Sequence, residues 1–313
     1  MPVSQDRAFG RLTERLARYA RQGAVTIVLE GESGTGKSFL ARRVHEWSPR
    51  AARPFQEVSL AALDDGIAGA ELFGYVPGAF TDARTRRAGH FVSANGGTVF
   101  LDEFGKASPA VQRKLLRVIE TGVVWPIGSD RPISTDVRLV VATLEPLSAL
   151  VAEGSMFPDL YARLGCFHLR IPPLRERVAD IPHLVETSIE KHAPSCGYSG
   201  SRPNVHPDLM ELLLQAPWPY NIRQLDAVVL RLLVDAVGAP SLTPQLCDGH
   251  VEEWLGVSRS PRVPLSADVL KRAIETTGSV SGAARELGVH RSTVHRHLAD
   301  DRLRSTGGSI PPS

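Results

Sequence analysis

The sequence predicts an α/β domain with a mostly parallel β-sheet, followed by purely helical segments. Up to about residue 173, short apolar runs rich in β-branched residues alternate with stretches of helical periodicity. This alternation is typical of a parallel sheet covered by helices. A glycine-rich turn joins the first apolar run to the helix behind it. After Pro172 and Pro173 only helical periodicity remains, which indicates a change of architecture.

The α/β part should contain three buried strands and three helices. The strands are the continuous apolar runs at residues 25–29, 98–101 and 138–143. The helices are an amphipathic one over 8–22, with Phe9, Leu12, Leu16 and Tyr19 on one face, and two more over 38–47 and 109–122. The last of these has strong end signals, because serine caps a helix start, proline suits the first helical position and glycine suits the end.

The remaining chain divides by composition. Residues 179–192, 205–215 and 221–237 have helical periodicity, and the stretch GVSRSPRVP has the composition of a linker. The predicted division is an α/β subdomain over 1–173, a helical lid over 174–255, a linker over 256–265, a helix-turn-helix unit over 266–304 and a disordered tail over 305–313.

Bulk composition limits the possible functions. The 313-residue chain has a formal net charge of +2, so any nucleic-acid surface must be local. Cys166, Cys196 and Cys247 are far apart and form no CxxC pair, which argues against a disulfide framework or a zinc site. No apolar run is long enough for a signal sequence or a membrane span. We therefore expect a cytoplasmic protein with no membrane partner.

A phosphate-binding motif follows the first strand. Its residues are Gly31, Glu32, Ser33, Gly34, Thr35, Gly36, Lys37 and Ser38. The pattern G-x-x-x-x-G-K-[ST] between a strand and a helix indicates a P-loop, whose backbone N–H groups surround phosphates. Lys37 should reach the β- and γ-phosphates, and the Ser38 hydroxyl should bind Mg²⁺. The alternative is a glycine turn without function.

Two carboxylates end the second strand. Asp102 would hold Mg²⁺ through its coordination shell, and Glu103 would polarise the attacking water. The alternative is an acidic helix cap. The two motifs together indicate ATP or GTP and leave open which work the nucleotide does.

The C-terminal unit has the spacing of a helix-turn-helix. Ala284 would pack where the helices cross, Gly288 would form the turn and Val294 would fill the core. Its recognition helix, residues 290–299, offers Arg291, Ser292, Thr293, His295 and Arg296 as DNA contacts. Residues 258–304 contain nine Lys or Arg against five Asp or Glu. The alternative is a helical hairpin with a charged face, and the histidines there suit DNA better than a metal.

Residues 24–237 resemble the AAA+ domain of bacterial enhancer-binding proteins, the sigma-54-dependent transcription activators. The resemblance lies in GESGTGKS, ELFGYVPGAFTDA, GGTVFLDEFG, VQRKLLRVIETG, DLYARLGCFHLRIPPLRERVADIP and WPYNIRQLDAVVLRL. The last unit resembles the Fis-type DNA-binding domain of the same proteins.

That resemblance implies ATP rather than GTP and a homo-oligomeric ring, usually a hexamer. Hydrolysis in this family drives a loop against sigma-54 in the polymerase–promoter complex. The matching loop residues are Gly78, Ala79, Phe80, Thr81, Asp82 and Ala83. The resemblance further implies that Arg163 is offered to the neighbouring subunit's ATP and that Arg223 faces the nucleotide of its own subunit.

Four positions depart from the family pattern. Asp82 stands where the family has glycine, Ser59 where it has asparagine, Leu144 where it has asparagine and Phe157 where it has arginine. Residues expected to bind nucleotide are kept, whereas residues expected to hydrolyse it, or to couple hydrolysis to sigma-54, are altered. This asymmetry predicts slow or conditional turnover, or a mixed ring with a related chain.

Two functions stay open at this point. One is a sigma-54 activator that binds upstream activator DNA and remodels sigma-54 RNA polymerase using ATP and Mg²⁺. The other is a DNA-binding regulator whose AAA+ domain binds ATP without remodelling sigma-54. An unrelated P-loop enzyme, such as a metabolite kinase, is a third candidate. Fewer than 25 residues precede the first strand, so we expect no room for a receiver domain there.

Overall fold

The computed structural model describes residues 4–63, 65–81, 83–165, 167–198, 202–237, 239–246, 267–280, 282–283 and 294. The chain forms two compact units, one from Met1–Lys191 with Trp218–Leu230 and one from His192–Pro217 with Arg231–Ser313.

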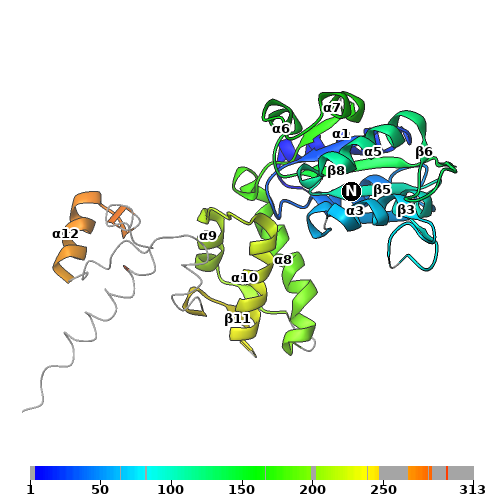
Figure 1. Cartoon of the computed structure of the whole chain (residues 1–313). Helices are drawn as coiled ribbons and strands as arrows, with labels where there is room; N and C mark the ends of the chain where they lie inside the picture. The colour runs from blue at the N-terminus through cyan, green and yellow to red at the C-terminus, as the bar shows by residue number, and fades with distance from the viewer. Residues whose placement is uncertain are drawn as a thin grey trace, which may run out of the picture. The chain divides into compact units, whose positions relative to one another are not determined.

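The first unit is built on a five-stranded sheet in which all neighbouring strands are parallel (Figure 1). Its strands, in spatial order, are β2 (Phe55–Ser59), β5 (Thr98–Asp102), β8 (Arg138–Thr143), β1 (Ile27–Glu30) and β9 (His168–Arg170). The predicted α/β class and the three predicted strands are confirmed. The outer strands β2 and β9 were not predicted, because each is short and carries polar residues.

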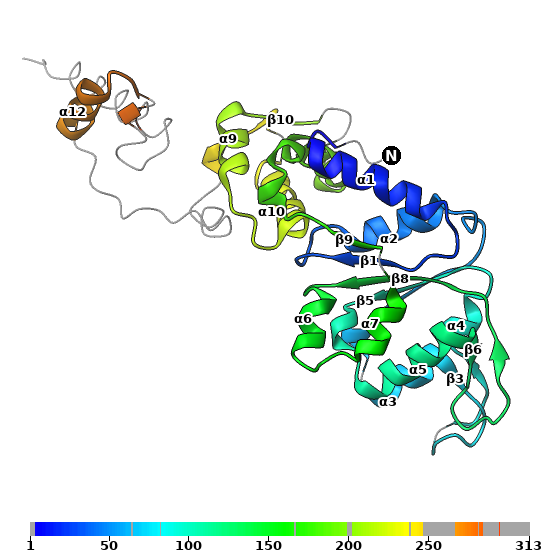
Figure 2. The ribbon, with the colours of Figure 1, turned by 90° about the horizontal axis from the view of Figure 1, so that it is seen from above.

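Helices cover both faces of this sheet (Figure 2). On one face lie α1 (Arg7–Ala20) and α2 (Lys37–Glu46), and on the other lie α3 (Asp65–Phe73), α4 (His90–Ser93), α5 (Pro109–Thr121), α6 (Leu147–Ala152) and α7 (Pro158–Leu164). Alternation along each strand divides the core. In β1, Ile27 and Leu29 pack toward α1 and α2, whereas Val28 packs toward the opposite helices. Helix α5 begins and ends as predicted, with Ser108 as N-cap and Gly122 in the left-handed conformation.

Two short antiparallel ribbons leave the α/β layers. Their strands are β3 (Gly74–Tyr75) with β4 (Arg87–Ala88), and β6 (Val123–Val124) with β7 (Ile133–Ser134). The ribbons are tied together where Val76 N–H donates to the Ile127 carbonyl and Ile127 N–H donates to Gly74. This tie fixes the base of the loop that carries Phe80 and Thr81. Short 3₁₀ helices in the described ranges complete the connections: η1 (Leu60–Ala62), η2 (Phe104–Lys106), η3 (Leu174–Glu176), η4 (Val178–Asp180), η5 (Ala193–Cys196) and η6 (Pro244–Leu246).

The helical segments after residue 173 also agree with the prediction. They are α8 (Ile181–His192), α9 (Pro207–Gln215) and α10 (Asn221–Asp235), and a two-stranded parallel pair joins β10 (Asn204–Val205) to β11 (Ser241–Leu242). None of the helices in the described ranges is long and apolar enough to cross a bilayer.

The predicted DNA-binding unit is described only in part. It contains α12 (Ala267–Thr277), and Val294 is buried as expected of a core position. The candidate DNA contacts Arg291, Ser292, Thr293, His295 and Arg296 lie outside the described residues. The proposed linker and tail lie outside them too, so the domain division stays a prediction.

A buried arginine joins α1 to the sheet. Arg138, at the start of β8, is 1% exposed and donates to the carbonyls of Tyr19, Ala20 and Val25 at 2.9, 2.6 and 3.3 Å. Burial lowers the pKa of Arg138 to about 10, so the guanidinium stays charged at neutral pH. At the end of α1 it adds a charged donor to the carbonyls of Tyr19 and Ala20, which also accept longer backbone bonds from Gln22 and Gly23, at 3.2 and 3.3 Å.

Replacing Arg138 by methionine would remove the charged donor that these three carbonyls share. We expect Arg138→Met to lower the free energy of unfolding by about 3 kcal/mol, since bonds to charged groups are the stronger kind. Urea unfolding measures this, with Arg15→Met on the exposed face of α1 as the control. Equal stability of the two variants would contradict the assigned role.

Candidate nucleotide-binding site

The phosphate-binding loop lies at the carboxyl edge of the sheet, between β1 and α2. Gly34 and Gly36 have positive φ values of 75° and 100°, which favour glycine. A Cβ on Gly34 would collide with the Tyr220 carbonyl oxygen. The loop therefore needs glycine both for its own conformation and for close packing against the segment that begins α10.

Lys37 is held at the centre of the loop. Its ammonium donates to the carbonyls of Gly31 and Glu32 at 2.7 and 2.9 Å, and the residue is 7% exposed. Burial lowers the pKa of Lys37, and the nearby carboxylates of Asp102 and Glu103 oppose that shift. The loop thus presents a largely desolvated cation where phosphate oxygens would lie.

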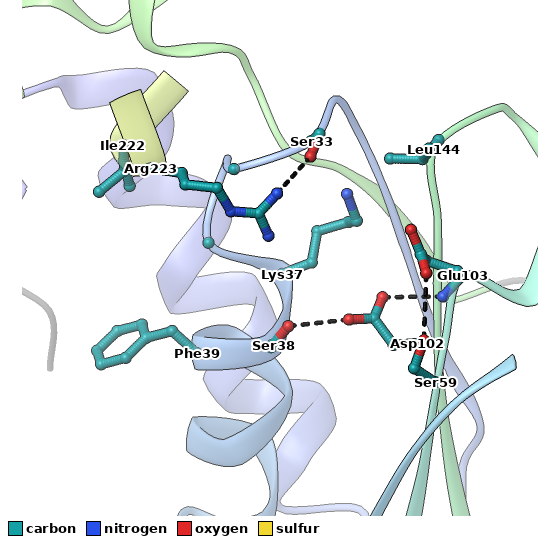
Figure 3. Close-up of a pocket in the computed structure, with 12 residues that line it drawn as sticks. Ser33, Lys37, Ser38, Phe39, Ser59, Asp102, Glu103, Leu144, Ile222 and Arg223 are labelled. Atoms are coloured by element: carbon teal, nitrogen blue, oxygen red, sulfur yellow. Dashed lines mark hydrogen bonds between the residues drawn. The ribbon is translucent and has the colours of Figure 1, made fainter. Parts of the chain in front are cut away.

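Ser38 and Asp102 approach each other from α2 and β5. The Ser38 hydroxyl donates to Asp102 Oδ2 at 3.0 Å, and Asp102 Oδ1 accepts from Glu103 N–H at 2.9 Å (Figure 3). A hydroxyl and one carboxylate, completed by phosphate oxygens and water, is an oxygen set that Mg²⁺ accepts. Among the described residues there is no cluster of three or more His, Cys, Asp or Glu side chains, so an all-protein metal site is not present in that part of the chain.

Glu103 has an unusual backbone conformation. Its φ is 53°, in the left-handed region that non-glycine residues seldom adopt. The Ser59 hydroxyl, at the end of β2, donates to Glu103 Oε2 at 3.2 Å (Figure 3). Ser59 therefore does reach the carboxylate that the sequence assigned to the attacking water, despite being shorter than asparagine.

Arg223 comes to the loop from α10. Its guanidinium donates to the Ser33 hydroxyl at 3.0 Å, and the neighbouring Ile222 N–H donates to the Gly34 carbonyl at 2.9 Å. The first turn of α10 is therefore attached to the loop through both backbone and side chain. Arg223 thus lies beside the phosphate loop of its own subunit, and its role toward a nucleotide stays a prediction.

Glu32 brings a negative charge into the loop, and a network missed by sequence reasoning offsets it. Arg175 in η3 forms a two-pronged ion pair with Glu32, at 2.8 and 2.5 Å. The hydrogen bond from Arg175 is the largest cause of a lowered pKa at Glu32. The charge on Glu32 is thus balanced before any phosphate arrives.

Asn221 is the second missed residue. It is fully buried, and its side-chain amide donates to Glu32 Oε2 and to the Ser33 carbonyl, at 3.2 and 2.9 Å. Its side-chain oxygen accepts from Leu174 N–H at 2.7 Å. Its φ of 53° suits asparagine, which tolerates the left-handed region better than most residues. The signal available in the sequence was an asparagine just before a helical run.

These groups enclose one pocket of about 350 Å³. It is lined by Ser33, Gly34, Gly36, Lys37, Ser38, Phe39, Ser59, Asp102, Glu103, Leu144, Ile222 and Arg223. In Figure 3 the carboxylates, Ser59 and Leu144 lie on one side of Lys37, and Phe39, Ile222 and Arg223 lie on the other. Gly31, Glu32 and Thr35, also predicted to bind nucleotide, shape the loop from outside the described lining of the pocket.

Arg163 lies elsewhere on the same unit. It is exposed on α7 and pairs with Glu120 of α5 at 3.2 Å. It is not among the described residues that line the pocket. Phe157, where the family pattern has arginine, is half-buried and packs against the core. The role of Arg163 toward the nucleotide of a neighbouring subunit stays a prediction.

The Gly78–Ala83 segment forms a tight loop at the tip of the β3–β4 ribbon. Gly78 N–H donates to the Ala83 carbonyl at 2.8 Å, and Ala83 N–H donates to Phe80 at 3.0 Å. Phe80 is 45% exposed, and its ring meets Tyr75 edge-on with centroids 4.9 Å apart. Ala79 and Thr81 complete the described part of the loop, and Asp82 lies outside the described residues.

Three known families match successive parts of the chain. Residues 3–170 match the Sigma-54 interaction domain. The chain belongs to this family. Residues 175–247 match the AAA+ ATPase lid domain, and residues 264–300 match the Fis family of bacterial regulatory proteins. The metabolite-kinase alternative is therefore excluded.

Individual relatives agree with this membership. The chain is 38% identical to the transcriptional regulatory protein XylR of Pseudomonas putida over 95% of its own length and 56% of the relative's. It is 37% identical to ZraR of Escherichia coli, over 95% and 68% of the two lengths. The chain thus spans little more than half of XylR. A crystal structure of NtrX from Brucella abortus in complex with ATP matches with a TM-score of 0.70 and 30% identity, over 95% of this chain and 68% of that one.

The Asn221 contacts can be separated from its backbone conformation. Asn221→Ala and Asn221→Gly both remove the side-chain bonds, but only alanine is strained at positive φ. We expect both variants to lose stability, and alanine to lose about 1–2 kcal/mol more than glycine. We also expect both to bind ATP about tenfold more weakly, that is by about 1.4 kcal/mol, since both amide bonds that hold the loop at Glu32 and Ser33 are lost.

Urea unfolding and a fluorescent ATP analogue measure the two effects. Equal stability of the two Asn221 variants would contradict the backbone assignment. Unchanged ATP affinity in both would contradict a role in holding the loop.

Proposed function

We propose that this protein is an ATP-driven transcription regulator that binds DNA and remodels sigma-54 RNA polymerase. The observation that carries the proposal is the pocket in which Lys37, Ser38, Asp102, Glu103 and Arg223 converge within a member of the Sigma-54 interaction family. ATP as the nucleotide is supported by the related NtrX, which is crystallised with ATP. A regulator of the bacterial chromosome would work in the cytoplasm.

The residues of the pocket suit phosphoryl transfer to water. Lys37 and Arg223 would bind phosphate oxygens, and Ser38 with Asp102 would hold Mg²⁺. When bound, that ion would neutralise charge on the β- and γ-phosphates. Glu103 would accept a proton from the attacking water as the water oxygen bonds to the γ-phosphorus. The bond from that phosphorus to the bridging oxygen would break, which yields ADP and phosphate.

Arg163 would act between subunits. Its ion pair with Glu120 is exposed on both sides, so releasing it should cost less than about 1 kcal/mol. A neighbouring subunit, in a homo-oligomeric ring such as a hexamer or in a mixed ring, would then receive the guanidinium at its γ-phosphate. Such a residue stabilises charge in the transition state.

The Gly78–Ala83 loop would touch sigma-54, and the C-terminal unit would bind upstream activator DNA. Phe80 is a partly exposed aromatic residue on a ribbon tied to the ATPase core. Exposed aromatic residues of this kind often dominate protein interfaces. The Fis-family match supports a DNA partner.

A second function is favoured by one observation. Leu144 lines the phosphate pocket and is 42% exposed, so a side chain that cannot hydrogen-bond occupies a place beside Glu103. With Asp82 and Phe157 also altered, the chain could bind ATP for assembly and regulate transcription without remodelling sigma-54.

ATP turnover tests the motor directly. We expect hydrolysis per protomer to rise cooperatively with protein concentration, because in this proposal Arg163 serves the pocket of a neighbouring subunit. Glu103→Gln should reduce the rate about 100-fold or more, as expected for a lost general base. A wild-type rate equal to that variant, with ATP binding intact, would favour the second function.

Coupling to polymerase is tested with a repaired variant. We expect Asp82→Gly, Leu144→Asn and Phe157→Arg together to increase open-complex formation at a sigma-54 promoter about tenfold or more, since Leu144→Asn restores a hydrogen-bonding side chain beside Glu103. Phe80→Ala in that background should abolish the gain and leave ATP hydrolysis unchanged. No gain in the repaired variant would show that these positions do not limit activity.

A further inference from the structure

Arg113 is an exposed arginine on α5 that has no assigned role. Its guanidinium lies over the Phe157 ring, 5.9 Å from the centroid. Within the described ranges no carboxylate lies at ion-pair distance from it. An arginine that rests on an aromatic face is partly ordered and keeps its five N–H donors available. Arg113 therefore resembles a binding group more than a surface charge in a salt bridge.

The neighbouring Gln112 fixes the register between α5 and the start of α7. Its side-chain nitrogen donates to the carbonyls of Ala107 and Ser155, and its oxygen accepts from Phe157 N–H at 3.0 Å. Gln112 is 3% exposed, so these bonds are protected from water. The position of the Phe157 ring under Arg113 is therefore set by a buried clamp and not by the surface contact alone.

Arg113 and Arg163 occupy opposite ends of one surface. Helices α5 and α7 lie side by side in both ribbon views (Figures 1 and 2), and Arg163 reaches α5 at Glu120. Residues 113 and 120 are separated by about 10 Å along α5. The two guanidiniums therefore belong to the same face of α5. Arg113 lies beside Phe157, and Arg163 lies beside Glu120, two turns further along the helix.

We propose that Arg113 is a second arginine offered to the nucleotide of the neighbouring subunit. It takes the place of the arginine that position 157 lacks. The inference rests on the proposed function, in which Arg163 acts between subunits. Neither arginine is among the described residues that line the pocket of their own unit, which supports action on a neighbour.

The chemistry fits a γ-phosphate in transfer. The developing charge is spread over planar oxygens, which match a guanidinium fork better than an ammonium. Position 157 supplies the platform and position 113 the charge, so two residues on adjacent helices replace one arginine. Arg117, one turn further along α5, is a matched control. Its guanidinium lies over the Trp125 ring instead, with the guanidinium carbon 4.3 Å from the ring centroid.

The test compares ATP hydrolysis by full-length wild type, Arg113→Ala and Arg117→Ala, with assembly measured by light scattering. We expect Arg113→Ala to lower the maximal rate at least about tenfold, with ATP affinity unchanged. Arg117→Ala should stay within twofold of wild type, that is, within about 0.4 kcal/mol. Phe157→Arg added to Arg113→Ala should restore most of the rate.

A mixing experiment distinguishes action on a neighbour from action within one subunit. Arg113→Ala keeps a working Glu103 but offers no guanidinium, and Glu103→Gln offers Arg113 but cannot hydrolyse. In a randomly mixed ring the pair should recover about one quarter of the wild-type rate per protomer. A mixture no faster than its components would overturn the assignment between subunits.

Other outcomes are equally decisive. An Arg113→Ala rate equal to that of Arg117→Ala, with wild type active, overturns this inference and leaves the proposed function standing. Loss of assembly in Arg113→Ala would make Arg113 an assembly contact and overturn its catalytic role. A wild-type rate equal to Glu103→Gln overturns both proposals.

Discussion

The site depends on the end of β1 in the interior of a parallel sheet. Strands β8 and β9 flank β1, and Glu30 and Thr143 lie in register at the carboxyl edge. Because all five strands are parallel, the carboxyl ends of β2, β5 and β8 reach that edge as well. Ser59, Asp102 and Leu144 therefore meet the phosphate loop although they are far apart in sequence. Ligands in open α/β sheets bind at such an edge for this reason.

Electrostatics then decides what the edge can hold. ATP brings a large negative charge, yet Glu32, Asp102 and Glu103 all lie on or beside the loop. The Glu32 charge is balanced by Arg175, which leaves Lys37 and Arg223 available to phosphate. Lys37 is desolvated, and its pKa falls for that reason, but the two remaining carboxylates favour its charged form. The pocket is thus arranged for a polyanion accompanied by a divalent cation.

Much of this arrangement could be predicted from sequence, because short motifs fix it. The strand–glycine–helix pattern located Lys37 and Ser38, and the acidic end of a buried strand located Asp102 and Glu103. The Arg175–Glu32 pair joins residues 143 positions apart, and Asn221 reaches Ser33 across 188. No local pattern encodes such contacts, since they arise only when η3 and the start of α10 pack on the loop. The burial of Arg138 could not be predicted either, because its partners on α1 are distant in sequence and an arginine at a strand start is normally exposed to solvent.

The substitutions around the site differ in what the structure gains from them. Phe157 replaces a long charged side chain with a ring that is half-buried in the core beside α5. Burying apolar surface stabilises the fold by about 25 cal/mol per Å², so the change at 157 brings a packing gain. Leu144 gains much less, because it remains 42% exposed toward the pocket. A fold that benefits from Phe157 can keep it if another cation serves the same place, whereas nothing in the packing favours leucine at 144. A change in the chemistry of the pocket therefore explains Leu144 better than a gain in stability does.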